Sequence, residues 1–126
     1  MKTIKPKLAP TARFNKPLFV NVKDLGYKEM CCQIKQRGFA SSELWTLDYA
    51  IALFVLPRLR EFAKNSRGHP FNLTPRQWEE ILADMVFAFE MTVNEHSPTR
   101  EYKGADWKRM DKGFRLFGKW FRHLWD

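Results

Sequence analysis

The C-terminal segment of this chain carries apolar side chains at alternating intervals of three and four residues. An α-helix completes a turn every 3.6 residues, so this spacing places all of them on one face, whereas a strand needs alternation at every second residue. The pattern predicts a helix from about Asp106 to the end of the chain. Its buried stripe consists of Trp107, Met110, Phe114, Phe117, Phe121 and Leu124.

A second segment with helical spacing runs from Glu43 to about Asn65, and Ser41 or Ser42 can cap its start. Pro57 lies inside this segment, and a proline there removes a backbone hydrogen bond and predicts a kink or a break. The predicted apolar stripe consists of Leu44, Leu47, Ile51, Phe54, Val55, Leu59 and Phe62.

Thr74, Pro75 and Gln77 mark the start of another helix. Thr74 can cap it, Pro75 suits the first turn, and Gln77 completes a capping box. This helix is expected to fade near Asn94, with a core face of Trp78, Ile81, Leu82, Met85 and Phe89. A further helix is predicted near residues 24–37, and Gly38 is its expected stop.

The cationic residues are concentrated near the N-terminus. The net charge is +8, and residues 1–40 hold nine Lys or Arg but only two acids. Three prolines lie among the first lysines, so residues 1–23 are predicted to form an irregular basic arm, with 18–22 as a short strand or docking segment. Residues 24–126 are the predicted helical domain: an all-α bundle of three to four helices. The charge indicates an anionic partner or a solubilising tail.

The chain lacks the motifs of common enzyme classes. It has no glycine-rich phosphate loop, no paired His/Cys metal spacing and no nucleophile motif. His69, His96 and His123 stand alone and are predicted to be loop or surface residues. Glu79, Glu80 and Asp84 could contribute to a Mg²⁺ site, but a second acidic pair is missing, so a solvated face is expected. No catalytic residue, metal or cofactor is predicted.

Two further features of the sequence indicate the cellular compartment. No run approaches the roughly 20 apolar residues that a membrane helix needs, so no membrane partner is expected. Cys31 and Cys32 are adjacent, and neighbouring cysteines rarely close a disulfide. A reducing cytoplasm is the simplest setting for such a chain.

Two charges interrupt the apolar stripe of residues 43–65. On a helical wheel Asp48 and Arg58 fall among the apolar positions, and buried charges are costly unless they are paired or bind a ligand. One interpretation is a structural ion pair. The other is a pocket in which Arg58 grips a phosphate and Asp48 accepts a hydrogen bond from a base edge.

The predicted last helix also has a basic face, formed by Lys108, Lys112, Arg115, Lys119 and Arg122. A solvated face is the usual meaning of such a stripe. Leu116 and Trp120 fall outside the core stripe, and Phe87 points away from Trp78 on its own helix. Exposed rings at these positions favour self-association or stacking on a base, and a homo-oligomer, most simply a tetramer, is expected.

Three groups of residues carry a resemblance to a known family. They are Arg37-Gly38-Phe39 with Glu43-Leu44-Trp45-Thr46-Leu47-Asp48 and Leu56-Pro57-Arg58-Leu59; Thr74 with Trp78-Glu79-Glu80-Ile81-Leu82-Ala83-Asp84-Met85; and Gly113 with Leu116-Phe117-Gly118-Lys119-Trp120-Phe121 and Leu124-Trp125-Asp126. Together they resemble a widespread family of short tailed-phage proteins over residues 28–126. The long basic arm departs from that pattern.

That phage family is similar to the anti-CBASS sponge proteins, which are homotetramers. The resemblance implies a protein that sequesters a cyclic dinucleotide of the cyclic GMP–AMP type without cleaving it, in the cytoplasm of an infected bacterium. Such a ligand needs cations for its phosphates and flat rings for its bases. The candidate ligand-binding residues are Arg37, Trp45, Asp48, Arg58, Lys119, Trp120 and Arg122. The alternatives are a nucleic-acid-binding protein and an inhibitor that binds a host protein through exposed rings.

Overall fold

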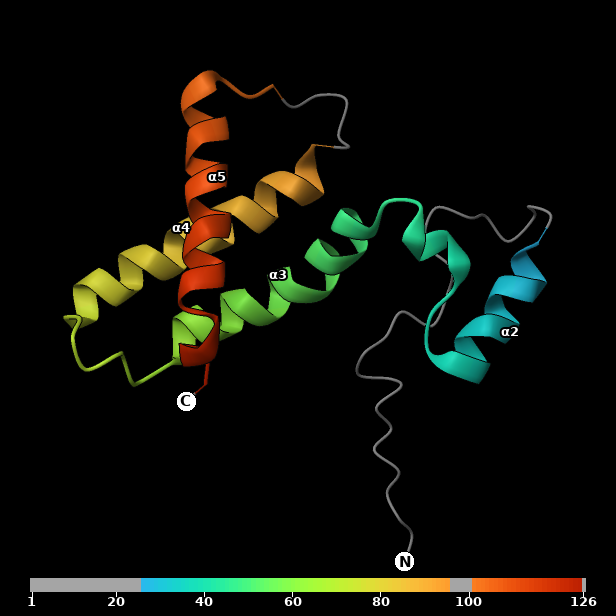
Figure 1. Ribbon diagram of the computed structural model, residues 1–126, viewed down its shortest axis with the longest axis horizontal. Coiled ribbons are helices and arrows are strands. Elements are labelled where there is room, and N and C mark those ends of the chain that lie inside the picture. The colour runs from blue at the N-terminus through green and yellow to red at the C-terminus, as the bar shows by residue number, and fades with distance from the viewer. Residues whose placement is uncertain (1–25, 96–100, 126) are drawn as a thin grey trace, which may run out of the picture. The chain divides into compact units, whose positions relative to one another are not determined.

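The computed structural model describes residues 26–95 and 101–125 (Figure 1). This part of the chain is helical and contains no strand, which confirms the predicted all-α class. Its elements are α2 (Tyr27–Arg37), the 3₁₀-helix η1 (Ser41–Leu44), α3 (Leu47–Asn65), α4 (Pro75–Asn94), α5 (Gly104–Lys119) and the 3₁₀-helix η2 (Phe121–His123). The predicted arm over residues 1–23 lies outside the described residues. No described helix has the length and apolar character to cross a membrane.

The chain divides within α3 into two compact units, residues 1–54 and 55–126. In the first unit, α2 ends where the sequence predicted. Gly38 adopts a left-handed conformation with φ of 92°, and its backbone N–H donates to the carbonyl of Ile34 at 2.8 Å. A positive φ suits glycine, which lacks a Cβ, so the stop signal works through the backbone.

Helix α2 carries both cysteines, and both are free thiols, as expected for adjacent residues. A hydrogen bond with the Cys31 side chain raises the pKa of the Tyr27 hydroxyl above its usual value of 10.0. The exposed Cys32 lies beside this pair in the sequence.

The predicted start of the helix at Glu43 is wrong, because residues 41–44 form a separate 3₁₀ turn. The Glu43 carboxylate accepts a hydrogen bond from the backbone N–H of Ala40 at 3.0 Å. The backbone N–H of Ser41 donates to Oε1 of Gln33 on α2 at 2.8 Å. These two bonds fix the turn against α2, and α3 begins only at Leu47.

The buried face of α3 also differs from the predicted stripe. Leu44 and Leu47 are half exposed, and Ile51 is 46% exposed. Of the predicted stripe only Leu59 is fully buried, and the other buried positions of α3 are Ala50, Ala52 and Leu56, which lie outside that stripe. Asp48 and Arg58 are both exposed, so the expectation of buried charges at these positions is wrong. The helix continues through Pro57, so the predicted break does not occur.

Helix α4 follows its sequence signals closely. Thr74 Oγ1 accepts a hydrogen bond from the Gln77 N–H at 3.1 Å, and Gln77 Oε1 accepts one from the Thr74 N–H at 2.9 Å. This reciprocal pair is the predicted capping box. Four members of the predicted core face, Trp78, Leu82, Met85 and Phe89, are buried, while the fifth, Ile81, is only half-buried.

Helix α5 crosses α4 at close range (Figure 1). The crossing point is Gly113, where an added Cβ would lie 2.7 Å from the Ala88 Cβ and would collide with the backbone carbonyl of Asp84. On one side of the crossing, Phe89 makes edge-to-face contacts with the rings of Phe114 and Phe117, at centroid distances of 5.1 and 4.9 Å. Only glycine permits this approach of the two helices.

Several expectations for the last helix are wrong. Helix α5 begins at Gly104 and ends at Lys119, and the following 3₁₀ turn leaves Phe121 59% exposed. Trp107 is exposed as well, because α5 crosses α4 instead of lying along it. Trp120 was expected on an outer face but is only 8% exposed. Leu116 and Phe87 are half-buried, and the Arg109 guanidinium covers the Phe87 ring at 4.4 Å.

Candidate ligand-binding pocket

The second unit contains a cavity of about 460 Å³, which we call the tryptophan pocket. A volume of this size lies within the usual range for small-molecule sites. Its lining residues are Gly68, His69, Pro70, Phe71, Asn72, Trp78, Trp120, His123 and Trp125.

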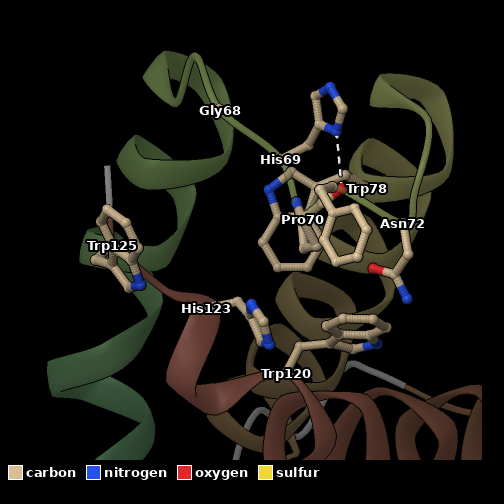
Figure 2. Close-up of a pocket in the computed structure, with 9 residues that line it drawn as sticks. Gly68, His69, Pro70, Asn72, Trp78, Trp120, His123 and Trp125 are labelled. Atoms are coloured by element: carbon tan, nitrogen blue, oxygen red, sulfur yellow. Dashed lines mark hydrogen bonds between the residues drawn. The ribbon is translucent and has the colours of Figure 1, made fainter.

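Three parts of the second unit meet around this pocket. Trp78 comes from the first turn of α4, Trp120 directly follows α5, and His123 belongs to η2. The Trp78 and Trp120 rings meet edge to face at a centroid distance of 5.9 Å, and the Trp120 and His123 rings at 5.2 Å. Figure 2 shows Pro70 and Asn72 on one side of the cavity and Trp120 and His123 on the other.

The loop that precedes α4 is held by hydrogen bonds to the carbonyl of Pro70. His69 Nδ1 lies 3.0 Å from this oxygen, and the backbone N–H of Leu73 donates to it at 3.0 Å. A carbonyl oxygen only accepts, so His69 Nδ1 carries the proton in this contact. The capping box at Thr74 then fixes the point where the loop becomes helix.

The Trp120 indole N–H is buried and has no acceptor among the described residues. An indole nitrogen can only donate a hydrogen bond, and a buried donor without a partner costs about 1–3 kcal/mol. Trp120 contributes its ring to the pocket lining, but its nitrogen has almost no accessible surface.

Two cations lie next to lining residues in the sequence, and one of them contacts a lining ring. Lys119 Nζ lies 5.4 Å from the centroid of the Trp120 ring, and Arg122 belongs to the same 3₁₀ turn as His123. Among the described residues that line the cavity there is no carboxylate. A flat ring attached to an anionic group therefore suits this pocket better than a quaternary ammonium ion, which aromatic cages also accept.

The structure brings together three of the seven residues that the sequence suggested for ligand binding. Lys119, Trp120 and Arg122 are consecutive or nearly so at the end of α5. Arg58 is exposed on α3 and does not line the pocket. The remaining three, Arg37, Trp45 and Asp48, belong to the first unit.

Arg37 is engaged locally in the first unit. Its Nε donates to the carbonyl of Phe39 at 3.1 Å and its Nη2 to Ser41 Oγ at 3.0 Å, while its guanidinium covers the Phe39 ring at 4.2 Å. These contacts join the end of α2 to η1, which is a structural use of the side chain.

Sequence reasoning missed six polar or aromatic lining residues: His69, Phe71, Asn72, Trp78, His123 and Trp125. His69 and His123 are exposed, as predicted, but they line the same cavity and so do not act as isolated surface residues. Trp78 was assigned to the core alone. Spacing along a helix could not reveal that the 68–72 loop and the chain after α5 meet.

Two members of the acidic cluster of α4, Glu80 and Asp84, form ion pairs. Glu80 lies 3.5 Å from Arg76, and both are exposed. Asp84 is mostly buried, so the expected solvated face is wrong at this position. Its carboxylate accepts a hydrogen bond from Arg109 Nε at 2.8 Å, and Lys112 Nζ lies 3.4 Å from its other oxygen. Nowhere in the described ranges do three His, Cys, Asp or Glu residues gather in a way that could hold a metal ion.

Comparison of the chain with protein-family models, with curated proteins and with solved structures finds no match.

Proposed function

We propose that this protein binds a cyclic dinucleotide of the cyclic GMP–AMP type in the tryptophan pocket and holds it uncleaved. In an infected bacterium it would act as a phage sponge that keeps this signal from CBASS effectors. The observation that carries the proposal is the meeting of three tryptophans around one cavity with cations beside it. The resemblance of the sequence to phage proteins supports the same function.

Stacking is the first contribution that the pocket offers. Nucleobases stack on indole and imidazole rings, and one base on an aromatic side chain contributes about 1–3 kcal/mol. Trp125 is 74% exposed and Trp120 is buried, so the pocket has an outer and an inner ring. A base entering from solvent would cover apolar surface on both.

Charge is the second contribution. A cyclic dinucleotide carries two phosphates, and Lys119 and Arg122 are both exposed and adjoin the lining residues Trp120 and His123 in the sequence. The arginine fork matches two phosphate oxygens at once, while lysine acts as a point charge. No acidic side chain among the described lining residues opposes them.

Thermal melting in the presence of cyclic GMP–AMP tests the proposal. A ligand at about 100 times its dissociation constant adds roughly 2.7 kcal/mol of stability, so the melting temperature should rise clearly. Chromatography of the released ligand should recover it intact. Absence of any melting shift with cyclic dinucleotides at millimolar concentration would refute the proposal.

A matched pair of variants tests the location of the site. Trp125→Ala removes an exposed pocket ring and should weaken binding roughly tenfold without unfolding the protein. Trp107→Ala removes a partly exposed ring that does not line the pocket and should bind as the wild type does. Equal effects of the two substitutions would place the ligand elsewhere.

Arg58→Lys tests the phosphate site suggested by the sequence. Lysine keeps the charge but loses the planar fork, so weaker binding of the Arg58→Lys variant would place the phosphate site on α3.

A salt series tests the nucleic-acid alternative, for which the exposed basic face of α5 is suited. Binding of labelled DNA that falls steeply with salt, together with no cyclic dinucleotide binding, would favour that alternative.

A further inference from the structure

We infer that a second cavity, which we call the basic groove, binds the phosphate monoester group of a small organic molecule. Its volume of about 360 Å³ lies within the usual range for small-molecule sites. It shares no described lining residue with the tryptophan pocket, and the inference does not depend on the proposed function. Residues of α3, α4 and α5 line it: Arg60, Ala63, Lys64, Ala83, Val86, Phe87, Glu90 and Arg109.

Two neighbours hold the guanidinium of Arg109 at this groove. Its Nε donates to Asp84 Oδ1 at 2.8 Å, and its Cζ lies 4.4 Å from the centroid of the Phe87 ring. Because Phe87 also lines the groove, this contact places the charged group there, and not only the aliphatic stem. Neither Nη atom of Arg109 donates a hydrogen bond to a described residue. Both can therefore bind oxygens of an anion.

Helix α3 contributes two further cations, Arg60 and Lys64, which lie one helical turn apart. Nη2 of Arg60 donates to Glu90 Oε2 at 2.7 Å, and Glu90 lines the groove, so this guanidinium also lies there. Lys64 is exposed and forms no ion pair with a described residue. Its ammonium group is carried on a flexible stem and can turn towards a bound anion.

The charge of the groove favours a dianion. Three cations and one carboxylate among the described lining residues leave a formal charge of +2. Asp84 does not line the groove, and it pairs with Lys112 as well as with Arg109, so it offsets only part of this charge. A phosphate monoester carries a charge of about −1.5 to −2 at neutral pH and has three acceptor oxygens.

The apolar lining favours an organic ester over inorganic phosphate. Ala63 and Val86 are half-buried, and Ala83 is exposed. Covering such side chains with an apolar group removes their surface from water, which a bare phosphate ion cannot do. A phosphate that carries a compact apolar group therefore matches both the charge and the surface of the groove.

Phenyl phosphate and phenyl sulfate test the inference, since they have similar shapes and different charges. At about pH 8 the phosphate ester is a dianion, whereas the sulfate ester is a monoanion. In isothermal titration calorimetry the protein should bind phenyl phosphate about tenfold more tightly than phenyl sulfate, as expected for one additional charge-assisted contact. It should also bind phenyl phosphate more tightly than inorganic phosphate. Equal affinity in either comparison would overturn the inference.

A matched pair of variants tests the role of Lys64. Lys64→Gln removes a groove cation without breaking an ion pair among the described residues and should weaken phenyl phosphate binding about tenfold. Lys108→Gln removes an exposed cation that does not line the groove and should bind as the wild type does. Equal weakening by both would show attraction to the net charge alone and overturn the inference.

Backbone amide NMR signals separate the groove from the tryptophan pocket. Phenyl phosphate should move the signals of Lys64, Phe87 and Arg109. Shifts confined to residues 68–72 and 120–125 would place the probe in the tryptophan pocket and overturn the inference. Lys64→Gln should leave the melting shift caused by cyclic GMP–AMP unchanged, so failure of the proposed function and failure of the groove are distinguishable.

A short phosphotyrosine peptide distinguishes the source of the phosphate ester. It carries the same aromatic phosphate as phenyl phosphate, attached to a polypeptide. Affinity no higher than that of phenyl phosphate would support a small molecule as the ligand. A clear gain in affinity would assign the groove to a phosphorylated protein and overturn the inference.

Discussion

Thr74 links the pocket loop to α4 through a single side-chain oxygen. Its Oγ1 accepts the N–H of Gln77, and its own N–H donates to Gln77 Oε1. Thr74→Ala removes the first of these bonds and should lower the free energy of unfolding by about 1 kcal/mol. Chemical denaturation measures this change.

Thr74→Ser is the matched control for this prediction. Serine keeps the capping oxygen, so its unfolding free energy should stay close to that of the wild type. If serine and alanine destabilise the protein equally, the methyl group of Thr74 matters and the cap does not.

At the scale of helices, the crossing of α4 and α5 depends on Gly113. Gly113→Ala places a methyl group against the backbone of Asp84 and the Ala88 side chain, so one helix must move. Overpacking of this kind costs about 1–3 kcal/mol, more than the higher helix propensity of alanine returns. Thermal and chemical denaturation should show the loss.

Gly118 provides a control on the same helix. An added Cβ there meets nothing within 4 Å, so Gly118→Ala should be neutral or should stabilise the protein by up to about 1 kcal/mol. Destabilisation by both substitutions would show that α5 needs glycine for a reason other than the crossing.

The helices differ in how well the sequence predicts them, and the reason is physical. Helix α4 has a capping box and one apolar face, so local signals and burial agree. Helix α3 has apolar residues on more than one side, so periodicity alone selected a face of which only Leu59 is fully buried, and Asp48 and Arg58 were misplaced with it. For α5, the crossing angle and the 3₁₀ turn decide burial, and neither is encoded in spacing.

The pocket was predictable only in part for the same reason. Lys119, Trp120 and Arg122 were identified because they are close in the sequence. The contributions of Asn72 and Trp78 depend on a meeting of segments more than 40 residues apart. Charge and ring content indicated a kind of ligand, and tertiary contacts determined the residues.

At the scale of the whole molecule, assembly remains a prediction on revised grounds. Trp120 is buried and no longer supports it, but Leu44, Trp45, Leu47 and Ile51 are exposed. We expect a homo-oligomer, most simply a tetramer, since closed symmetric assemblies are the commonest solution. Light scattering at micromolar concentration should give a mass well above the 15.0 kDa of one chain.

Substitutions of exposed residues test where the subunits of the predicted oligomer contact each other. Replacing Trp45 and Leu47 together by serine should lower the measured mass, because this removes two large exposed side chains. Phe121→Ser alters an equally exposed ring at the other end of the chain and should leave the mass unchanged. A mass near that of one chain for the wild type would end the prediction.

The placement of three of the five tryptophans around one cavity gives the protein its own optical reporter. Indole emission responds to polarity and to stacked bases, so a ligand in the pocket should quench the emission of the three tryptophans that line it. Trp45 and Trp107 lie outside the lining and supply a steady background. Ligand can therefore be titrated into unlabelled protein while tryptophan emission is recorded. The emission that remains at saturation measures the contribution of tryptophans outside the pocket.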